Sequence, residues 1–343
     1  MATHLVAISS PLQLINAMEA LSHHRLQPED CQLIVRAVAG TQNDKVIREL
    51  LNEASWASIY WYDSKSKFLM LPKLLHHFKG SHWQVVVGGE LTPWWLNTLY
   101  ANIEMESLVL VDDGVMTLAD HDKYLSKGRL PEKTKGFKDK VLGLLGFNTM
   151  SFEIESPLEL FTIFDLESTQ YCSVSKNEMR VLRQQLAERQ AFADDGDIVF
   201  VGQPLVGIGM VTWKTVKQHL LAVRSQSPTG RVIYCTHRNE DAEDISRIRE
   251  LDGFEVVTFP CPIEIGLSRL EQPISMLVGF CSTALFTLNQ FYQELPIKFV
   301  EFESDEYLTE EYRRNAGNIY QNLAQSIPKL EQAEPRAMNT AYP

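Results

Sequence analysis

Short apolar runs alternate with helical segments along most of this chain of 343 residues. Runs such as HLVAIS (4–9), WQVVVGG (83–89) and SLVLVDD (107–113) are separated by amphipathic stretches such as NDKVIRELLNEA and KFLMLPKLLHHF. Strands that alternate with helices are typical of βαβ units, because neighbouring parallel strands need a crossover between them. The pattern therefore predicts an α/β fold with mainly parallel sheets.

The alternation is interrupted once and then restarts, which predicts two domains. Residues 120–190 have a looser pattern, and a clear strand pattern returns with DIVFVGQPL at 197–205. A chain of this length also exceeds the commonest size of a single domain. We expect a Rossmann-like N-terminal domain over residues 1–190, a Rossmann-like C-terminal domain over 191–330 and a flexible tail over 331–343.

Composition and charge limit the partners and the compartment. The net charge of −12 argues against broad nucleic-acid binding, which requires a basic surface. The cysteines are widely spaced and form no C-x-x-C pair, so neither a disulfide framework nor a zinc cluster is indicated. The first residues lack a basic region, and their apolar run LVAI is too short for a signal peptide or a membrane span. We expect a cytoplasmic protein with at most a peripheral association with the inner membrane.

Two adjacent carboxylates, Asp112 and Asp113, follow the apolar run SLVLV and precede Gly114. Ligands of open α/β sheets bind outside the carboxyl ends of the strands, so this position indicates a functional loop. A plain turn is the alternative. The same tripeptide recurs as Asp194-Asp195-Gly196, but this copy precedes its predicted strand and is expected to be a turn.

Asp120-His121-Asp122 has the D-x-D spacing that holds a divalent cation in some enzymes. Two common acids within three residues are weak support for a metal site, and the sequence places them in a loop. No other His, Asp and Glu residues show ligand spacing. We therefore expect neither a metal ion nor another cofactor.

Polar residues follow three predicted strands in the second half of the chain. His237 and Arg238 follow VIYC, Glu264 lies in CPIEIGL after FEVVTFP, and Ser282 and Thr283 lie in LVGFCSTALFTL. A carboxylate such as Glu264 can accept hydrogen bonds from vicinal hydroxyls such as those of a ribose. Hydroxyls and free N–H groups at a helix start bind phosphate well, although Ser282 is equally well explained as a simple N-cap.

The loop VGQPLVGIGM opens the second half of the chain, with Gly202 and Gln203 at its start. It matches neither G-x-G-x-x-G nor a Walker loop. The residues alone predict a flexible connection between a strand and a helix, at the edge of a cleft.

Taken in order, SPLQL, DDG, GQPL, YCTHRNE, PIEIGL and GFCSTALFTL resemble bacterial sialyltransferases with the GT-B fold, in particular the lipooligosaccharide sialyltransferase and capsule polysialyltransferase group. The resemblance implies two Rossmann-like domains whose parallel sheets face a central cleft. The N-terminal domain would bind the acceptor and the C-terminal domain the CMP-sugar. The implied reaction is metal-independent, inverting transfer of sialic acid from CMP-sialic acid to a galactose-terminated glycan or glycolipid, in bacterial surface glycan synthesis.

The resemblance also implies the roles of single residues. The DDG motif supplies the general base, for which Asp112 is favoured and Asp113 is the alternative, and His237 acts on the phosphate of CMP. The histidine motif of the family is often His-Pro, whereas Arg238 follows here and supplies a cation beside that phosphate. The positions expected to bind the donor are Gly202, Gln203, Arg238, Glu264, Ser282 and Thr283.

Other readings of the same residues remain open. A GT-B transferase could use another nucleotide sugar, such as CMP-Kdo or a UDP-hexose. A non-catalytic protein could bind a sugar nucleotide with the same fold. In a third reading, the polar residues only cap helices and form turns in an α/β protein.

Overall fold

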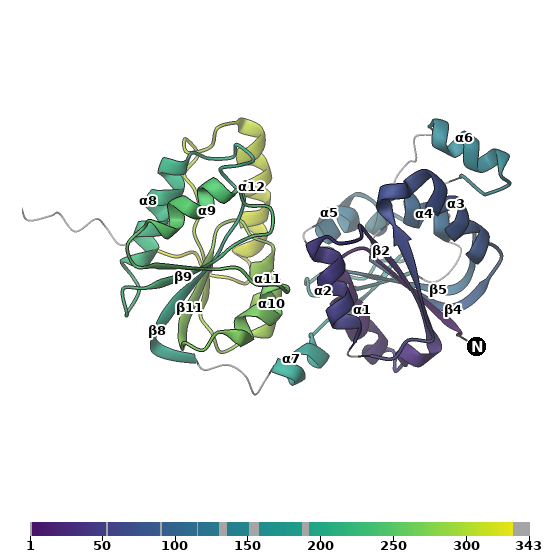
Figure 1. The fold of residues 1–343 in the computed structure, drawn as a ribbon, viewed down its shortest axis with the longest axis horizontal. Coiled ribbons are helices and arrows are strands. Elements are labelled where there is room, and N and C mark those ends of the chain that lie inside the picture. The colour runs from purple at the N-terminus through teal and green to yellow at the C-terminus, as the bar shows by residue number, and fades with distance from the viewer. Residues whose placement is uncertain are drawn as a thin grey trace, which may run out of the picture. The chain divides into compact units, whose positions relative to one another are not determined.

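The computed structural model describes residues 2–52, 54–89, 91–114, 116–129, 136–150, 158–186 and 192–331. The chain forms two compact units, Met1–Gln185 and Leu186–Pro343, and each contains one parallel sheet flanked by helices (Figure 1). The predicted α/β class with parallel sheets is confirmed. Residues 332–343 of the predicted tail lie outside the described residues.

The N-terminal unit is built on a seven-stranded sheet of order β3-β2-β1-β4-β5-β6-β7, in which every pairing is parallel. Its strands are β1 (His4–Ile8), β2 (Cys31–Ala37), β3 (Ser58–Asp63), β4 (His82–Gly88), β5 (Glu104–Val111), β6 (Leu158–Thr162) and β7 (Ser173–Lys176). Its helices are α1 (Pro11–His23), α2 (Gln42–Leu51), α3 (Lys67–Phe78), α4 (Trp94–Tyr100), α5 (Met116–Lys123), α6 (Phe137–Leu144) and α7 (Arg180–Leu186).

Both faces of this sheet are buried, which explains why its strands are apolar throughout rather than alternating. In β1, Leu5 and Ala7 belong to one hydrophobic core, together with residues of α3 and α4. Val6 and Ile8 belong to a second core, together with residues of α1 and α2. Successive side chains of a strand point to opposite faces, so the two cores lie on opposite sides of the sheet.

Strands β6 and β7 lie where the sequence pattern was too loose to assign elements. They have only five and four residues, and β7 has the sequence SVSK with no buried residue. An edge strand needs no continuous apolar run, because it is less covered than a central strand. These two strands place Thr162 and Ile163 beside the end of β5.

The C-terminal unit has a five-stranded parallel sheet of order β10-β9-β8-β11-β12. Its strands are β8 (Phe192–Val201), β9 (Val232–Cys235), β10 (Phe254–Val257), β11 (Ile274–Gly279) and β12 (Ile297–Phe299). Its helices are α8 (Trp213–Arg224), α9 (Ala242–Arg249), α10 (Ile263–Gly266), α11 (Ala284–Phe291) and α12 (Glu310–Leu323). None of the helices in the described ranges combines the length and apolar character needed to span a bilayer.

The strand orders fix where a ligand crevice can form. From β8 the chain moves outward to β9 and β10, and then crosses to β11 on the other side of β8. The loops that follow β8 and β11 therefore leave the sheet in different directions, which is the topological switch point at which open α/β sheets bind ligands. Gly202 and Gln203 follow β8, and Ser282 lies just beyond β11.

Two local predictions were wrong. Asp194-Asp195-Gly196 lies within β8 and is not a turn. A Cβ at Gly196 would lie 2.5 Å from the carbonyl oxygen of Pro273, so this glycine permits a close approach of two backbones. Asp120-His121-Asp122 lies in helix α5 and not in a loop.

Candidate active site

Asp112 is buried at the end of β5, with both carboxylate oxygens occupied. The hydroxyl of Thr162 donates a 2.6 Å hydrogen bond to Oδ1, and the backbone N–H of Ile163 donates a 2.7 Å hydrogen bond to Oδ2. The amide of Asn16 donates to the backbone oxygen of Asp112 at 3.1 Å. Burial raises the pKa of Asp112 to about 6, although the hydrogen bonds from Thr162 and Ile163 oppose this rise. Asp112 therefore joins the ends of β5 and β6.

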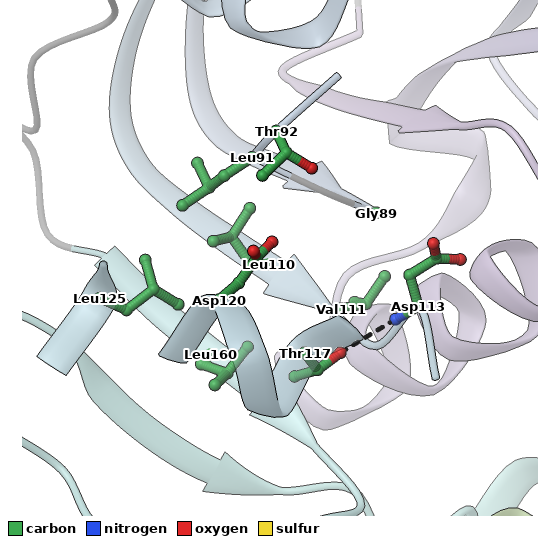
Figure 2. Close-up of a pocket in the computed structure, with 10 residues that line it drawn as sticks. All are labelled: Gly89, Leu91, Thr92, Leu110, Val111, Asp113, Thr117, Asp120, Leu125 and Leu160. Atoms are coloured by element: carbon green, nitrogen blue, oxygen red, sulfur yellow. Dashed lines mark hydrogen bonds between the residues drawn. The ribbon is translucent and has the colours of Figure 1, made fainter. Parts of the chain in front are cut away.

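Asp113 lies in a different environment, because it is half-exposed and lines a pocket (Figure 2). Its backbone N–H donates a 3.1 Å hydrogen bond to the hydroxyl of Thr117 on α5, and Gly114 continues the turn with φ +67°. The pocket has a volume of about 50 Å³. Since whole ligand sites measure roughly 300–1,000 Å³, it can form only part of a ligand site.

Asp120 on α5 lines the same pocket as Asp113. Burial raises the pKa of Asp120 to about 6, with the positive charge of Lys123 lowering it and the negative charge of Asp113 raising it further. Sequence reasoning missed Asp120 as a partner of Asp113. Its spacing of three residues from Thr117 was the available signal, since residues three apart share a helix face.

His237 lies in a hydrogen-bonded loop after β9. Its Nδ1 accepts a 3.1 Å hydrogen bond from the backbone N–H of Asn239, and its own backbone N–H donates to Oε2 of Glu240 at 2.5 Å. Burial and the charge of Arg238 lower the pKa of His237 below its usual value. The ring is therefore neutral at pH 7 and carries its proton on Nε2.

Glu240 connects this loop to the sheet. Oε1 of Glu240 accepts a 2.5 Å hydrogen bond from the buried hydroxyl of Tyr234, and burial raises the pKa of Glu240 to about 7. A Cβ at Gly202 would lie 2.7 Å from Oε2 of Glu240 and 2.7 Å from the carbonyl oxygen of Cys235. Only glycine fits at this position, so the loop after β8 lies directly against the loop after β9.

Ser282 and Thr283 connect β11 to helix α11. Ser282 is buried, and Thr283 is the N-cap residue but its side chain makes no capping hydrogen bond. The backbone oxygen of Ser282 accepts from the N–H of Leu285 at 3.2 Å. The hydroxyl of Thr283 is therefore not explained by side-chain capping of α11.

Gln203 adds an unsatisfied group at the same edge of the sheet. Its Oε1 is buried and has no hydrogen-bond partner among the residues that the structure describes. Buried polar atoms are nearly always paired, so an unpaired one beside a switch point is consistent with a ligand. Because β9, β8 and β11 are adjacent, the loops that carry His237, Gln203 and Ser282 lie along one edge of the C-terminal sheet.

Glu264 does not lie open to a ligand. It is buried at the start of α10, and Oε1 accepts a 2.6 Å hydrogen bond from the hydroxyl of Thr287 on α11. Its backbone oxygen accepts from the hydroxyl of Tyr292 at 2.7 Å, and burial raises the pKa of Glu264. This geometry gives no support to the predicted contact with a ribose, and instead indicates that Glu264 holds α10 against α11.

Comparison with known proteins identifies the fold of the chain but not its activity. No family model matches the chain. No curated protein matches it either. Among solved structures, the GT-B domain of a sialyltransferase from Photobacterium damselae is similar over 96% of this chain and 98% of that one, with 11% identity and a TM-score of 0.52. The chain has the GT-B fold.

Other solved structures with this fold are similar over comparable lengths. MurG from Acinetobacter baumannii matches over 96% of this chain and 86% of its own, with 10% identity and a TM-score of 0.44. The ADP-heptose LPS heptosyltransferase II of E. coli matches over 95% and 99%, with 10% identity and a TM-score of 0.41. A fold alone does not identify a donor, so the donor must be argued from the residues.

Proposed function

We propose that this protein is a sialyltransferase that moves sialic acid from CMP-sialic acid to a hydroxyl of a galactose-terminated glycan or glycolipid. The observation that carries the proposal is the contrast within the DDG motif. Asp112 is enclosed by hydrogen bonds, whereas its neighbour Asp113 lines a pocket at the carboxyl end of β5. A half-exposed carboxylate that lines a pocket at that end of the sheet is well placed to receive a proton from an acceptor hydroxyl.

Asp113 replaces Asp112 as the proposed general base. A base must reach the proton that it removes, and both oxygens of Asp112 already accept hydrogen bonds inside the domain. Asp120 lines the same pocket, and its negative charge makes the local electrostatic potential more negative. We assign Asp120 a supporting role, in which its carboxylate binds polar groups of the acceptor.

The donor is proposed to bind at the switch point of the C-terminal sheet. The leaving group of CMP-sialic acid is a phosphate ester, so its departure needs charge stabilisation more than proton transfer. The neutral His237 ring can donate its Nε2 proton to this phosphate, Arg238 supplies positive charge, and the hydroxyls of Ser282 and Thr283 donate hydrogen bonds.

The donor site includes the loop that follows β8. Gly202 lets this loop lie against Glu240, and Gln203 offers a buried oxygen that a hydroxyl or amino group of the nucleotide can satisfy. In this proposal residues 1–190 bind the acceptor and residues 191–330 bind the donor. The transfer is a single displacement with inversion and uses no metal ion, because protein groups meet the charge of the phosphate.

A donor panel tests the proposal directly. The purified protein is incubated with lactose and with CMP-sialic acid, CMP-Kdo or a UDP-hexose, and the products are analysed by mass spectrometry and NMR. We expect sialyl-lactose, with the anomeric configuration inverted relative to the donor. Transfer from CMP-Kdo or a UDP-hexose alone would assign another donor. Binding of CMP without turnover of any donor would indicate a non-catalytic protein.

A further inference from the structure

Two adjacent histidines and a glutamate lie close together in the N-terminal domain. They lie at the opposite end of the strands from Asp113, the proposed base. One ligand atom from each of His23, His24 and Glu159 lies within 4.8 Å of the other two. The histidines end helix α1, which begins at the carboxyl end of β1, and Glu159 is the second residue of β6. The cluster therefore lies at the amino end of the strands, whereas Asp113 follows the carboxyl end of β5.

The end of α1 is held in a defined conformation. The N–H of Leu26 donates to the carbonyl of Leu21 at 2.8 Å and that of Arg25 donates to Ser22 at 3.1 Å, which is the hydrogen-bond pattern of a Schellman motif. Arg25 takes the left-handed position with φ +57°, where glycine is usual. This ending fixes His24 as the C-cap residue.

The opposite side of the cluster comes from the sheet. Glu159 and Phe161 are two residues apart on β6 and so share the face that α1 covers. The ring of His23 packs against Phe161 with centroids 5.0 Å apart, and against His24 also at 5.0 Å. Both imidazoles are thus held above the strand that carries the carboxylate.

The atoms of the cluster are incompletely satisfied. Nε2 of His24 and Oε1 of Glu159 are buried and have no hydrogen-bond partner in the part of the chain that the structure describes. Nε2 of His24 also lies 3.3 Å from Oε2 of Glu159, which is an ion pair whenever the imidazole is protonated. Zinc ligands bound at about 2.0–2.2 Å in a tetrahedral arrangement are roughly 3.3 Å apart, so this pair already has the spacing of two metal ligands.

We propose that His23, His24 and Glu159 form a binding site for a zinc-like divalent cation. Two imidazole nitrogens and one carboxylate oxygen are a donor set that zinc accepts, with solvent completing the coordination. The carbonyl end of α1 adds partial negative charge that favours a cation. Because the cation would join α1 to β6, its role is to stabilise the N-terminal domain, and the site is independent of the proposed transfer chemistry.

The test measures Zn²⁺ binding to the full, tag-free chain by calorimetry, with Co²⁺ absorption as a report of the ligand geometry. We expect one Zn²⁺ per chain and a higher Tm in its presence. His24→Gln and Glu159→Gln should each weaken binding about tenfold or more and abolish the Tm increase. His23→Gln changes an exposed side chain, so it should weaken binding without disturbing the fold.

The matched control is a second histidine pair, His76 and His77, which lies in the last turn of helix α3 and belongs to no such three-ligand group among the described residues. The double variant His76→Ala/His77→Ala should bind Zn²⁺ as the unaltered protein does. The proposal is overturned if no Zn²⁺ binds, or if binding survives in all three cluster variants. Loss of binding in the control variant would also overturn it.

Discussion

The hydroxyl of Thr162 donates a 2.6 Å hydrogen bond to the carboxylate of Asp112 across the ends of two neighbouring strands. Through this hydrogen bond, Asp112, the first acid of the DDG motif, links the end of β5 to the end of β6. The second acid, Asp113, is left to line the pocket. We propose that the two adjacent carboxylates have separate tasks, so variants of each should behave differently.

Replacing Asp113 tests its proposed role as the general base. Asp113→Asn keeps the shape of the side chain but removes the group that accepts a proton. We expect kcat to fall about 100-fold or more, with the affinity for CMP nearly unchanged because the nucleotide is proposed to bind in the other domain. Steady-state kinetics and calorimetry with CMP measure the two effects separately. Near-normal kcat in this variant would remove Asp113 as the base.

Replacing Asp112 tests its proposed role in the stability of the fold. A carboxyl whose pKa is higher in the folded state binds its proton more tightly there, so the free energy of unfolding falls as pH rises. For Asp112 the rise in pKa from 3.8 to about 6 corresponds to roughly 3 kcal/mol in the free energy of unfolding. This stabilisation is lost mainly as the pH rises from about 4 to about 7. Asn at this position does not titrate. We therefore expect urea unfolding to show the native protein losing stability relative to Asp112→Asn over this range.

The kinetics of Asp112→Asn complete this comparison. At temperatures where the variant is folded, kcat should remain within a few-fold of the native value, because Asp112 is buried and is not among the residues that line the pocket. A loss of kcat as large as that expected for Asp113→Asn, in a protein of unchanged stability, would return the role of base to Asp112.

The alternation of apolar runs and helices was enough to predict two α/β domains with parallel sheets, because burial on both faces leaves a continuous apolar signal. The short edge strand β7 carries no such signal and was missed. Local sequence also cannot decide which of two adjacent acids is buried. Asp112 is enclosed by Thr162 and Ile163, which are about 50 residues away and reach it only once β6 pairs with β5.

The candidate sites show the same limit of sequence reasoning. His237 and Ser282 could be selected because each follows a predicted strand, and adjacent parallel strands bring such loops to one edge. Glu264 also follows a predicted strand, yet tertiary packing pairs it with Thr287. The pairing of His24 with Glu159 joins residues that have no relation in sequence, so only the folded domain brings them together.

The proposed phosphate site can be tested in the C-terminal domain. Ser282→Ala and Thr283→Ala should each weaken CMP binding by about 1.5–3 kcal/mol, since each removes a hydrogen bond to a charged group. Ser275→Ala is the control, because Ser275 lies on β11, which precedes Ser282, but donates to the backbone oxygen of Asp197 near the start of that strand. Calorimetry with CMP should distinguish the three variants. Unchanged affinity in both site variants would contradict the assignment.

Gly202 provides a test of packing between the loops. In Gly202→Ala the new Cβ would lie 2.7 Å from the carbonyl oxygen of Cys235, so we expect a loss of about 1–3 kcal/mol in stability and weaker CMP binding. Gly317→Ala is the matched control in helix α12, where a Cβ meets nothing within 4 Å. That substitution should stabilise the helix by roughly 0.5–1 kcal/mol. Equal thermal stability of the two variants would contradict the close contact.

The role of His237 predicts a particular pattern of rescue. Burial and Arg238 lower the pKa of His237, so we expect the ring to act as a neutral donor through Nε2. His237→Ala should slow turnover about 10-fold to 100-fold, and a donor with a more acidic leaving phosphate should restore part of the rate. His237→Gln should retain more activity than His237→Ala, because its amide can still donate a hydrogen bond.

Donors with a more acidic leaving phosphate also distinguish the proposed role of His237 from that of Asp113. A more acidic phosphate leaves without help, whereas the acceptor hydroxyl still needs a base, so Asp113→Asn should not be rescued to the same degree. The pH dependence gives a second check. Because the neutral ring is the proposed active form and its pKa is lowered, protonation of His237 should reduce kcat only at a pH below the usual pKa range of histidine. If the better donor rescues both variants equally, His237 does not act on the leaving group.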